Sequence, residues 1–432
     1  MTNNQKNKTA RKRIFTFITA IMLALVMILC SACDFKSFFK PSEKPSTDQT
    51  TTNPPSDGEN KDPNGDNKDP NGENKDPDGE NKDPNGEDKD PDGEDKDPDG
   101  EEKDEPSELE IHFLELGNKY AGDCTLIKVG DTEVLIDAGS KKGSAATIVP
   151  YIRQYCTDGV LEYVIATHAH EDHISAFVGT TTAKGIFDSF ECGIIIDYAL
   201  QNTTSQISKD YAAKRDAEVE AGAKHYTALE CVNETNGAQT TYELAEGVSM
   251  TILYQKFYET KSSDENNYSV CILLTQGEYN YLFTGDLEEA GEASLVESNP
   301  DLPHCKLFKG GHHGSRTSSN EILLSKITPD VVCICCCAGS PEYSVNADAI
   351  FPTQEMINRV AKYTKQIYVT SLATNVVLKD KSGTWDYTSM NGNIVVWSDG
   401  KDLTVTGSNN STILKETAWF KENRTWPEYG VE

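Results

Sequence analysis

The alternation of apolar and polar positions predicts a folded part that begins near residue 108. Alternating runs at 111–116 and 125–129, followed by an apolar run at 134–139, predict a meander of strands. Apolar spacing predicts a helix at 144–156, and the continuous apolar run at 163–167 is typical of a buried strand. Hairpins followed by strands that alternate with helices predict an α/β fold of two sheets with helices outside them. Later strands are predicted at 193–196, 250–254, 269–275, 279–283, 331–336 and 366–369, with a closing hairpin at 391–397 and 403–406.

Residues 1–33 have the pattern of an export signal. Five basic residues between Lys6 and Arg13 precede an apolar stretch at 14–29, which is a positive segment followed by a short hydrophobic core. The segment 31–33, Ser-Ala-Cys, resembles the lipobox of bacterial lipoproteins, except that Cys30 stands where leucine is usual. We therefore expect lipid attachment at Cys33, with an uncleaved N-terminal anchor as the alternative. Either anchor leaves the rest of the chain at the extracellular face of the cell membrane, and secretion is a further alternative.

Residues 34–107 are predicted to be a disordered acidic linker in front of a folded domain at 108–432. From Gly58 to Gly100 a glycine recurs every seven residues, in units such as Gly-Glu-Asn-Lys-Asp-Pro-Asn. The spacing does not indicate a coiled coil, because no position of the unit is apolar. Proline, glycine and excess acidic residues in the units indicate an extended spacer. A calcium-binding module is the less favoured alternative, since the repeats lack the apolar stacking position of a β-roll.

Acidic residues dominate the chain, whose formal net charge is −30. Residues 58–106 contain 21 Asp and Glu against 7 Lys, so about half of the excess lies in the linker and the rest is spread over the remaining chain. Phosphate binding along a nucleic acid needs clustered lysine and arginine. We therefore do not expect the domain to grip long nucleic acid across its whole surface.

The twelve cysteines do not predict a disulfide framework. Four of them crowd into residues 333–337, where neighbours in a strand point to opposite faces and rarely form a bridge. We expect these side chains to pack as small hydrophobic groups, with a metal or redox role as the less favoured alternative.

Histidine is concentrated at two places. Of the eight histidines, three lie within six residues, at His168, His170 and His173, and two are adjacent, at His312 and His313. The first run directly follows a predicted buried strand, so its side chains leave a loop that can aim several of them at one point. Imidazole and carboxylate groups at this density suit Zn²⁺, or Mn²⁺ and iron where oxygen ligands dominate. A polar loop without metal is the alternative.

The segment 167–173, Thr-His-Ala-His-Glu-Asp-His, resembles the His-x-His-x-Asp-His motif of the metallo-β-lactamase superfamily. The strands that end at Asp137 and at Asp286 resemble two further segments of that family. The segment 309–318 is similar to one in the extracellular hydrolase domain of ComEC competence proteins and their stand-alone relatives, as are 112–114, 122–124 and 266–270. The resemblance covers about residues 109–408 and implies a four-layer αββα metallo-β-lactamase sandwich.

The resemblance implies a binuclear site with two divalent ions, zinc first and manganese as the alternative. Such a pair of ions turns a bridging water into hydroxide near neutral pH. Many members supply another histidine before the bridging aspartate, and here Asn266 stands in that region, so Asn266, water or substrate would complete the first ion. The implied ligands are His168 and His170 for one ion, Asp172, His173 and His313 for the other, and Asp286 as the bridge.

Further side chains near the predicted ions are candidates for catalysis. Asp172 is expected to act in catalysis as well as in metal binding, and His312 to contact the phosphate or to protonate the leaving group. Asp123 is either a turn residue near the site or a substrate contact. Ser315 either binds phosphate or caps a helix that begins near residue 319. His112, on the first strand, is expected to be structural.

The predicted function is an exported metal-dependent hydrolase of phosphodiesters, with nucleic acid, a cell-wall polymer or a small phosphate ester as substrate. The phosphodiester prediction rests on the resemblance to ComEC proteins. A hydrolase of lactones or β-lactams is an alternative, and a surface binding module without turnover is another. We expect a monomer that is attached to the membrane through its N-terminal anchor.

Overall fold

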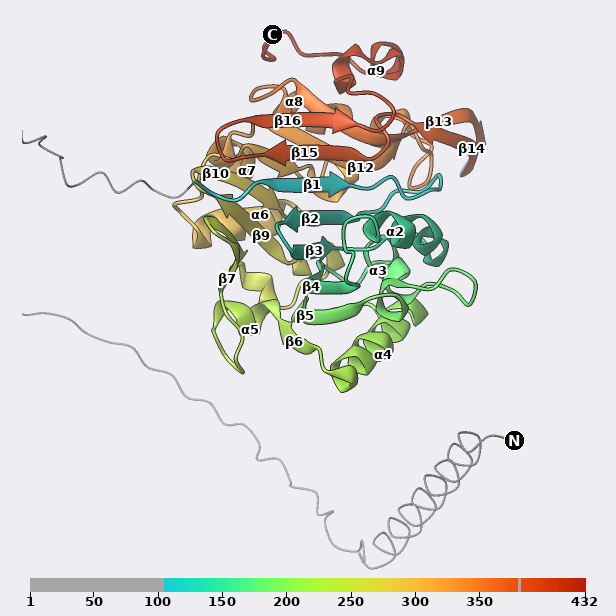
Figure 1. Cartoon of the computed structure of the whole chain (residues 1–432). Helices are drawn as coiled ribbons and strands as arrows, with labels where there is room; N and C mark the ends of the chain where they lie inside the picture. Colours follow the sequence, from blue (N-terminus) through green and yellow to red (C-terminus); the bar gives the residue numbers. More distant parts are fainter. Residues whose placement is uncertain (1–104, 380–381) are drawn as a thin grey trace, which may run out of the picture. The chain divides into compact units, whose positions relative to one another are not determined.

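The computed structural model describes residues 105–379 and 382–432, which form two eight-stranded mixed sheets with helices outside them (Figure 1). Strands β3 to β6 are parallel, and β1, β2, β15 and β16 pair in antiparallel fashion at the other end of the first sheet. In spatial order the first sheet contains β16 (Leu403–Gly407), β15 (Ile394–Ser398), β1 (Leu109–Phe113), β2 (Thr125–Val129), β3 (Thr132–Ile136), β4 (Val160–Ala166), β5 (Glu191–Asp197) and β6 (Lys224–Thr227).

The second sheet has the same mixed character. Strands β10 to β13 are parallel, and the strands on either side of them are antiparallel. In spatial order this sheet contains β14 (Ser382–Ser389), β13 (Gln366–Lys379), β12 (Val331–Ala338), β11 (Leu307–Lys309), β10 (Tyr279–Phe283), β9 (Cys271–Gln276), β8 (Val248–Leu253) and β7 (Thr241–Ala245).

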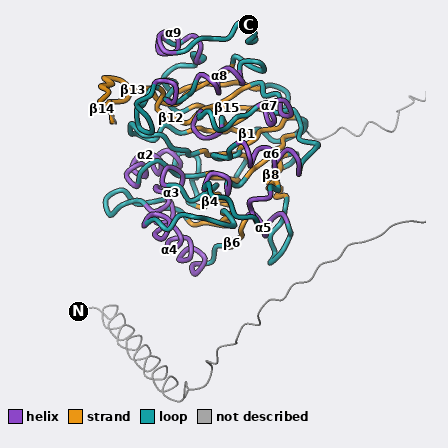
Figure 2. The backbone as a smooth tube through the Cα atoms, turned by 180° about the vertical axis from the view of Figure 1, so that it is seen from behind, coloured by secondary structure: helices purple, strands orange, loops and turns teal. Residues whose placement is uncertain are grey.

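The helices form two groups, one for each sheet, as the view from behind shows (Figure 2). Helices α2 (Ala145–Ile152), α3 (Glu171–Val178) and α4 (Gln206–Ala221) belong to the first sheet, and the short α5 (Ala228–Val232) follows β6. Helices α6 (Glu289–Ser298), α7 (Glu321–Ile327), α8 (Gln354–Val360) and α9 (Ala418–Asn423) belong to the second sheet.

The helices and sheets stack in four layers, and a hydrophobic cluster lies at each of the three interfaces between them. One cluster lies between the sheets, a second joins the first sheet to α2, α3 and α4, and a third joins the second sheet to α6, α7, α8 and α9. Strand β12 shows how the sequence builds this, because Cys333 and Cys335 belong to the cluster between the sheets and Ile334 and Cys336 to the outer one. The predicted αββα sandwich is thereby confirmed.

The cysteine prediction is confirmed for the part of the chain that the structure describes. All ten cysteines there are free and buried, including the run in β12. Burial raises the pKa of these thiols, as for Cys305, whose pKa rises to about 12. The side chains therefore act as small apolar groups in the core.

Several elements have other bounds in the structure than the sequence pattern predicted, and some were not predicted at all. The helix predicted at 144–156 is α2 with a short 3-10 turn (Lys142–Ser144) before it. Strand β13 extends to Lys379, well beyond the predicted 366–369, and β6, β7, β11 and β14 were not predicted. The predicted export signal, Cys33 and the repeat linker to residue 104 lie outside the described residues. Among the described residues, no helix has the length and apolar character needed to cross a membrane.

Candidate metal centre

The His168–His173 run lies where β4 passes into α3. Strand β4 ends at Ala166, and His170, in extended conformation, is the residue before the first turn of α3. His168 and His170 therefore lie on the loop, whereas Asp172 and His173 lie in the first helical turn. His168 and His173 are fully buried.

Two neighbouring loops hold the start of α3 through its backbone carbonyls. The Ala138 N–H donates to the His173 carbonyl at 2.7 Å, and the Asp123 N–H donates to the Asp172 carbonyl at 3.1 Å. At Gly139 the approach is so close that a Cβ atom would lie 1.5 Å from the Asp172 carbonyl oxygen. Glycine is the residue that allows this contact.

The second sheet supplies the other half of the cluster. Asp286 follows β10, and His312 and His313 follow β11 in a short 3-10 turn (Gly311–Gly314). Both histidines have left-handed backbones, with φ of 46° and 53°. Such conformations cost free energy in residues other than glycine and gather at functional sites, which is consistent with a turn that exists to aim two imidazoles.

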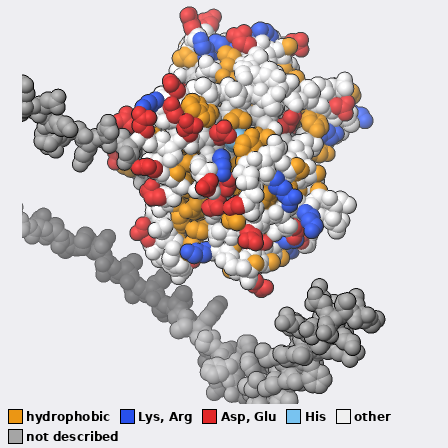
Figure 3. All heavy atoms as spheres, in the orientation of Figure 1, with side chains coloured by type: hydrophobic (Ala, Val, Ile, Leu, Met, Phe, Trp, Pro, Cys, Tyr) orange, Lys and Arg blue, Asp and Glu red, His pale blue; other side chains and the backbone are white. Residues whose placement is uncertain are grey.

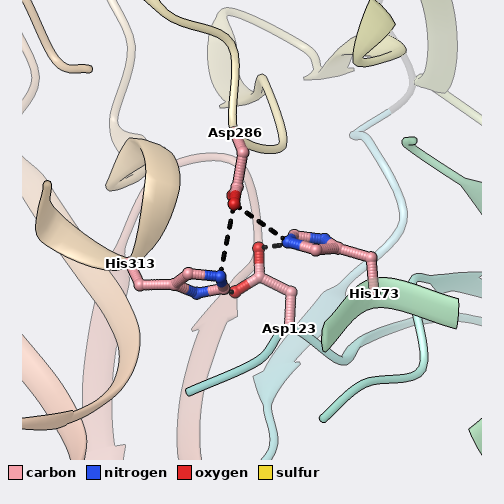
Figure 4. A group of neighbouring side chains, drawn as sticks. All are labelled: Asp123, His173, Asp286 and His313. Carbon is pink, nitrogen blue, oxygen red and sulfur yellow. Dashed lines mark ion pairs between the residues drawn. The ribbon is translucent and has the colours of Figure 1, made fainter. Parts of the chain in front are cut away.

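The side chains of Asp123, His173, Asp286 and His313 point toward one another (Figure 4), and Asp172 lies beside them. The His173 Nε2 and His313 Nε2 atoms lie 3.1 and 3.3 Å from the Asp286 Oδ2 atom. The His313 Nε2 atom also lies 3.4 Å from the Asp172 Oδ2 atom. The structure thus brings together Asp172, His173, Asp286 and His313, the residues assigned by sequence to one ion and the bridge.

The remaining predicted ligands lie directly beside this group. The His168 Nε2 and His170 Nδ1 atoms converge at 3.1 Å, and the rings of His168 and His173 lie 4.2 Å apart. Buried His173 Nε2, His313 Nε2 and Asp286 Oδ1 have no hydrogen-bond partner. Since buried polar atoms are normally paired, this convergence of donor atoms suits a cation.

Outer partners hold the Nδ1 side of both imidazoles. The Asp137 Oδ2 atom lies 2.7 Å from His173 Nδ1, and His313 Nδ1 lies 3.0 Å from the Cys335 carbonyl oxygen, with Asp123 Oδ1 beside it at 3.2 Å. This leaves the Nε2 atoms directed inward, as in metal sites where a carboxylate or a backbone carbonyl orients the imidazole. The sequence predicted either a turn role or a substrate contact for Asp123. In the structure its carboxylate lies beside His313, and one of its oxygens is within 4.8 Å of possible ligand atoms of His173, Asp286 and His313.

Lys309, for which the sequence suggested no role, is a buried cation behind the cluster. Its side chain, 3% exposed, forms an ion pair with Asp123 and lies 3.6 Å from Asp286 Oδ1. It also donates to the Gly285 carbonyl at 3.2 Å. The sequence offered no signal for this burial, because the three-residue strand β11 that contains Lys309 was not predicted. Lysine is rarely buried without a partner, and here the partner is Asp123.

The electrostatics of the cluster favour positive charge. Burial alone lowers the pKa of His173 and of His313, but Asp286 and the outer aspartates raise both pKa values well above the usual range. Burial alone raises the pKa of Asp286 and of Asp172, yet the neighbouring histidines hold both pKa values well below the usual range. By contrast, burial and the neighbouring His173 lower the pKa of His168. The site attracts protons or a cation to its inner atoms.

His312 is held differently from the predicted ligands. Its Nδ1 atom lies 3.2 Å from the Glu288 carboxylate and 3.1 Å from the Thr317 hydroxyl, while its Nε2 atom lies 3.9 Å from Asp286 Oδ2. Asn266 donates to Glu288 at 3.2 Å, and its buried Oδ1 atom has no partner. The Ser315 hydroxyl lies 3.0 Å from that of Thr317. Glu288, which the sequence did not indicate, thus joins His312 to Asn266.

A cavity of about 290 Å³ opens beside the cluster. Tyr343, from the loop after β12, donates a hydrogen bond from its hydroxyl to Asp172 Oδ2 at 2.5 Å. Its ring packs on that of Phe351, with 5.3 Å between the ring centroids. Lys141 pairs with Glu171 at 2.8 Å on the rim. The cavity is lined by Lys141, His170, Glu171, Asp172, Asp286, His312, Glu342 and Tyr343. His112 lies elsewhere, buried and 3.0 Å from the Tyr151 hydroxyl.

Parts of this chain are similar in sequence to a known protein family and to competence and recombination proteins. A family model of the metallo-beta-lactamase superfamily matches residues 117–184. Recombination protein 2 of Haemophilus influenzae is 26% identical over 272 residues, which are 62% of this chain and 28% of that protein. Competence protein ComA of Neisseria gonorrhoeae is 31% identical over 120 residues, which are 27% of this chain and 16% of that protein.

The chain spans less than a third of the length of these curated relatives. A solved metallo-beta-lactamase from Hirschia baltica is 16% identical, with a TM-score of 0.24, and the match covers 44% of this chain and 86% of that one. The family resemblance is confirmed: the chain is a relative of the metallo-β-lactamase superfamily and of the ComEC-like competence proteins.

Proposed function

We propose that this relative of the metallo-β-lactamase superfamily is an exported, binuclear metal-dependent hydrolase that cleaves phosphodiester bonds. The observation that carries the proposal is the convergence of unpartnered, buried His and Asp atoms beside a cavity of about 290 Å³. Zinc is the proposed metal, because imidazoles and carboxylates are its usual ligands, and manganese is the alternative.

The donor atoms divide into two sets. His168 Nε2 and His170 Nδ1 would hold one ion, and Asp172, His173 and His313 the other, with Asp286 shared between them. Two divalent ions supply a water-derived nucleophile near neutral pH and offset charge on the phosphoryl oxygens. Asn266 Oδ1, which is buried without a hydrogen-bond partner, is the atom proposed to complete the first set.

His312 is the proposed proton donor to the leaving group. Glu288 fixes its Nδ1 side, so the Nε2 atom can face the cavity that His312 lines. In the proposed reaction the water oxygen forms a bond to phosphorus and the bond to the leaving oxygen breaks. The leaving oxygen then takes the proton from His312, and the proton of the attacking water is released to solvent.

A small or wall-linked phosphodiester is a better candidate than a long duplex. On the face drawn in Figure 3, acidic side chains are widespread, and lysine and arginine form separate small groups among them. Binding along a duplex backbone needs a continuous basic surface. The phosphodiester class itself rests on the resemblance of segments such as 309–318 to the hydrolase domain of ComEC competence proteins.

Metal content and turnover test this proposal together. The full chain, loaded with zinc or manganese, is expected to bind up to two equivalents and to hydrolyse bis-p-nitrophenyl phosphate. His170→Ala should lower both metal content and turnover, whereas His304→Ala, an exposed histidine paired with Asp330, is the matched control. Unchanged metal content and activity in His170→Ala would refute the site. Turnover of a lactone or β-lactam in place of phosphodiesters would refute the substrate class.

We further propose that the chain is exported and held at the cell surface by a lipid on Cys33, within residues that the structure does not describe. Metabolic labelling with an alkyne fatty acid should mark the wild-type chain and not Cys33→Ala. Labelling of both variants, or of neither, would contradict lipid attachment at this residue.

A further inference from the structure

A second cavity, of about 490 Å³, shares His170 with the cavity beside the metal cluster. Its walls are formed by the loop after β5, a strand of the first sheet, and by the segment before β9, a strand of the second sheet. His170 lines both cavities, which makes them neighbours across a predicted metal ligand. The second cavity is lined by His170, Asn202, Thr203, Ser263, Asp264 and Glu265.

One carboxylate in this wall has an unused acceptor. The Glu265 Oε2 atom accepts hydrogen bonds from the backbone N–H groups of Asn202 and Thr203, at 2.5 and 3.0 Å. Its Oε1 atom is buried and has no hydrogen-bond partner, and the residue is only 6% exposed. A buried carboxylate oxygen without a partner is costly, which indicates that a ligand donates to it.

The chemistry of the lining is that of hydroxyl recognition. Every lining side chain offers a hydrogen-bonding group, and two of them, Asp264 and Glu265, are carboxylates that accept from O–H or N–H donors. The one aromatic ring in the lining, His170, is assigned to a metal ion, and no phenylalanine, tyrosine, tryptophan or arginine lines the cavity for a nucleobase to stack on. The carboxylates also disfavour a phosphate here, so a phosphoryl group belongs beside the metal cluster instead.

We propose that this cavity, the polyol lobe, binds a hydroxyl-rich group of a phosphodiester, such as a glycerol unit or another polyol without a nucleobase, next to the bond that is cleaved. The inference rests on the proposed function, and it names the substrate class as polyol phosphodiesters in place of nucleotides. The substrate then spans both cavities, with its phosphorus at the metal cluster and its polyol held between the β5 and β9 loops.

Equilibrium binding of phosphomonoesters tests the polyol lobe without turnover. The full, zinc-loaded chain is titrated with glycerol 3-phosphate, thymidine 5′-phosphate and phosphocholine in a calorimeter. Glycerol 3-phosphate is expected to bind about tenfold more tightly than thymidine 5′-phosphate, since it offers two hydroxyls to the lining carboxylates where thymidine 5′-phosphate offers one deoxyribose hydroxyl and a nucleobase. Tighter binding of thymidine 5′-phosphate or of phosphocholine would overturn the assignment.

Variants connect that preference to the lobe. Glu265→Gln and Ser263→Ala should each narrow the ratio of the glycerol and thymidine dissociation constants by about 2- to 10-fold, the effect of one net hydrogen bond. Ser325→Ala, an exposed serine of α7 that lines neither cavity, should keep the wild-type ratio.

Two results separate the possible failures. If Glu265→Gln unfolds because Oε2 also holds the loop backbone, the exposed Ser263 carries the test alone. An unchanged ratio in a folded Ser263→Ala and Glu265→Gln pair overturns the polyol lobe. Absence of bis-p-nitrophenyl phosphate turnover with an intact ratio refutes the proposed hydrolysis and leaves the lobe standing.

Discussion

Asp137→Asn measures how strongly an outer carboxylate sets the metal affinity of the cluster. The Asp137 Oδ2 atom lies 2.7 Å from His173 Nδ1, and the carboxylate also accepts from the backbone N–H and the hydroxyl of Thr167, both at 2.7 Å. For His173 Nε2 to bind a metal, its Nδ1 must carry the hydrogen and needs an acceptor.

An asparagine cannot satisfy both neighbours. Its single oxygen can keep the Thr167 N–H, but its NH₂ group then faces the His173 Nδ1–H, or else the histidine changes tautomer and places its hydrogen on Nε2. Either outcome removes an outer-shell partner of the ligand, and such losses cost about 10- to 100-fold in metal affinity, or about 1.4–2.7 kcal/mol.

Chelator competition at pH 7.5 gives the zinc dissociation constant, and circular dichroism verifies the fold. The control is Asp330→Asn, whose carboxylate also lies beside a histidine, 3.3 Å from His304, but at an exposed site. A folded Asp137→Asn protein with zinc affinity within about twofold of wild type would refute the orienting role of this carboxylate.

Three further predictions concern charge, pH and metal. Lys309→Met should destabilise folding by at most about 3–5 kcal/mol in urea titration, since it removes the ion-pair partner of buried Asp123 and leaves only the neighbouring histidines to compensate the carboxylate. An Asp123→Asn, Lys309→Met double variant should regain part of this loss, and a single-variant loss under about 1 kcal/mol would contradict the pairing. Burial raises the pKa of Glu292 to about 7 although Ser319 and Asn320 donate to it, so the protonated form is the one that folding favours. Protonated Glu292 stabilises the fold fully below the pKa that the residue has in the unfolded chain, and this stabilisation is lost as pH rises to about 7. The free energy of unfolding of Glu292→Gln should therefore rise relative to that of the wild type by about 1–3 kcal/mol between pH 4.5 and pH 7. A difference that does not change with pH would show that Glu292 does not titrate in this range. Zinc added at about 100 times its dissociation constant should raise the melting temperature of the metal-free protein by about 5 °C. The rise should be smaller for His170→Ala, and an equal rise in the variant and the wild type would contradict the site.

The sequence located half of the candidate centre because that half is local. The His168–His173 run lies within six residues after a buried apolar strand, and a strand-to-helix turn at that point places all its side chains at one end of the sheet. The period-two alternation likewise predicted that the β12 cysteines would face two hydrophobic layers. Both are properties of neighbouring residues.

Strands with little apolar alternation escaped prediction. Strand β14 is exposed along most of its length and reads as polar, since it pairs only with β13 at the edge of the second sheet. Strand β11 has three residues, too few for a period to be visible. Such elements form because the neighbouring strand offers its backbone hydrogen bonds, which no local pattern reports.

The tertiary structure alone decided which carboxylates and cations surround the histidines. Asp123, Asp137, Glu288 and Lys309 reach the cluster from four loops or strands, and their partners lie up to about 190 residues away in the chain. The sequence alone determines which residue types follow each strand. Only the packing of two sheets on one core brings the ends of β3, β4, β10 and β11 together, and with them an outer shell, a buried counter-ion and two adjoining cavities.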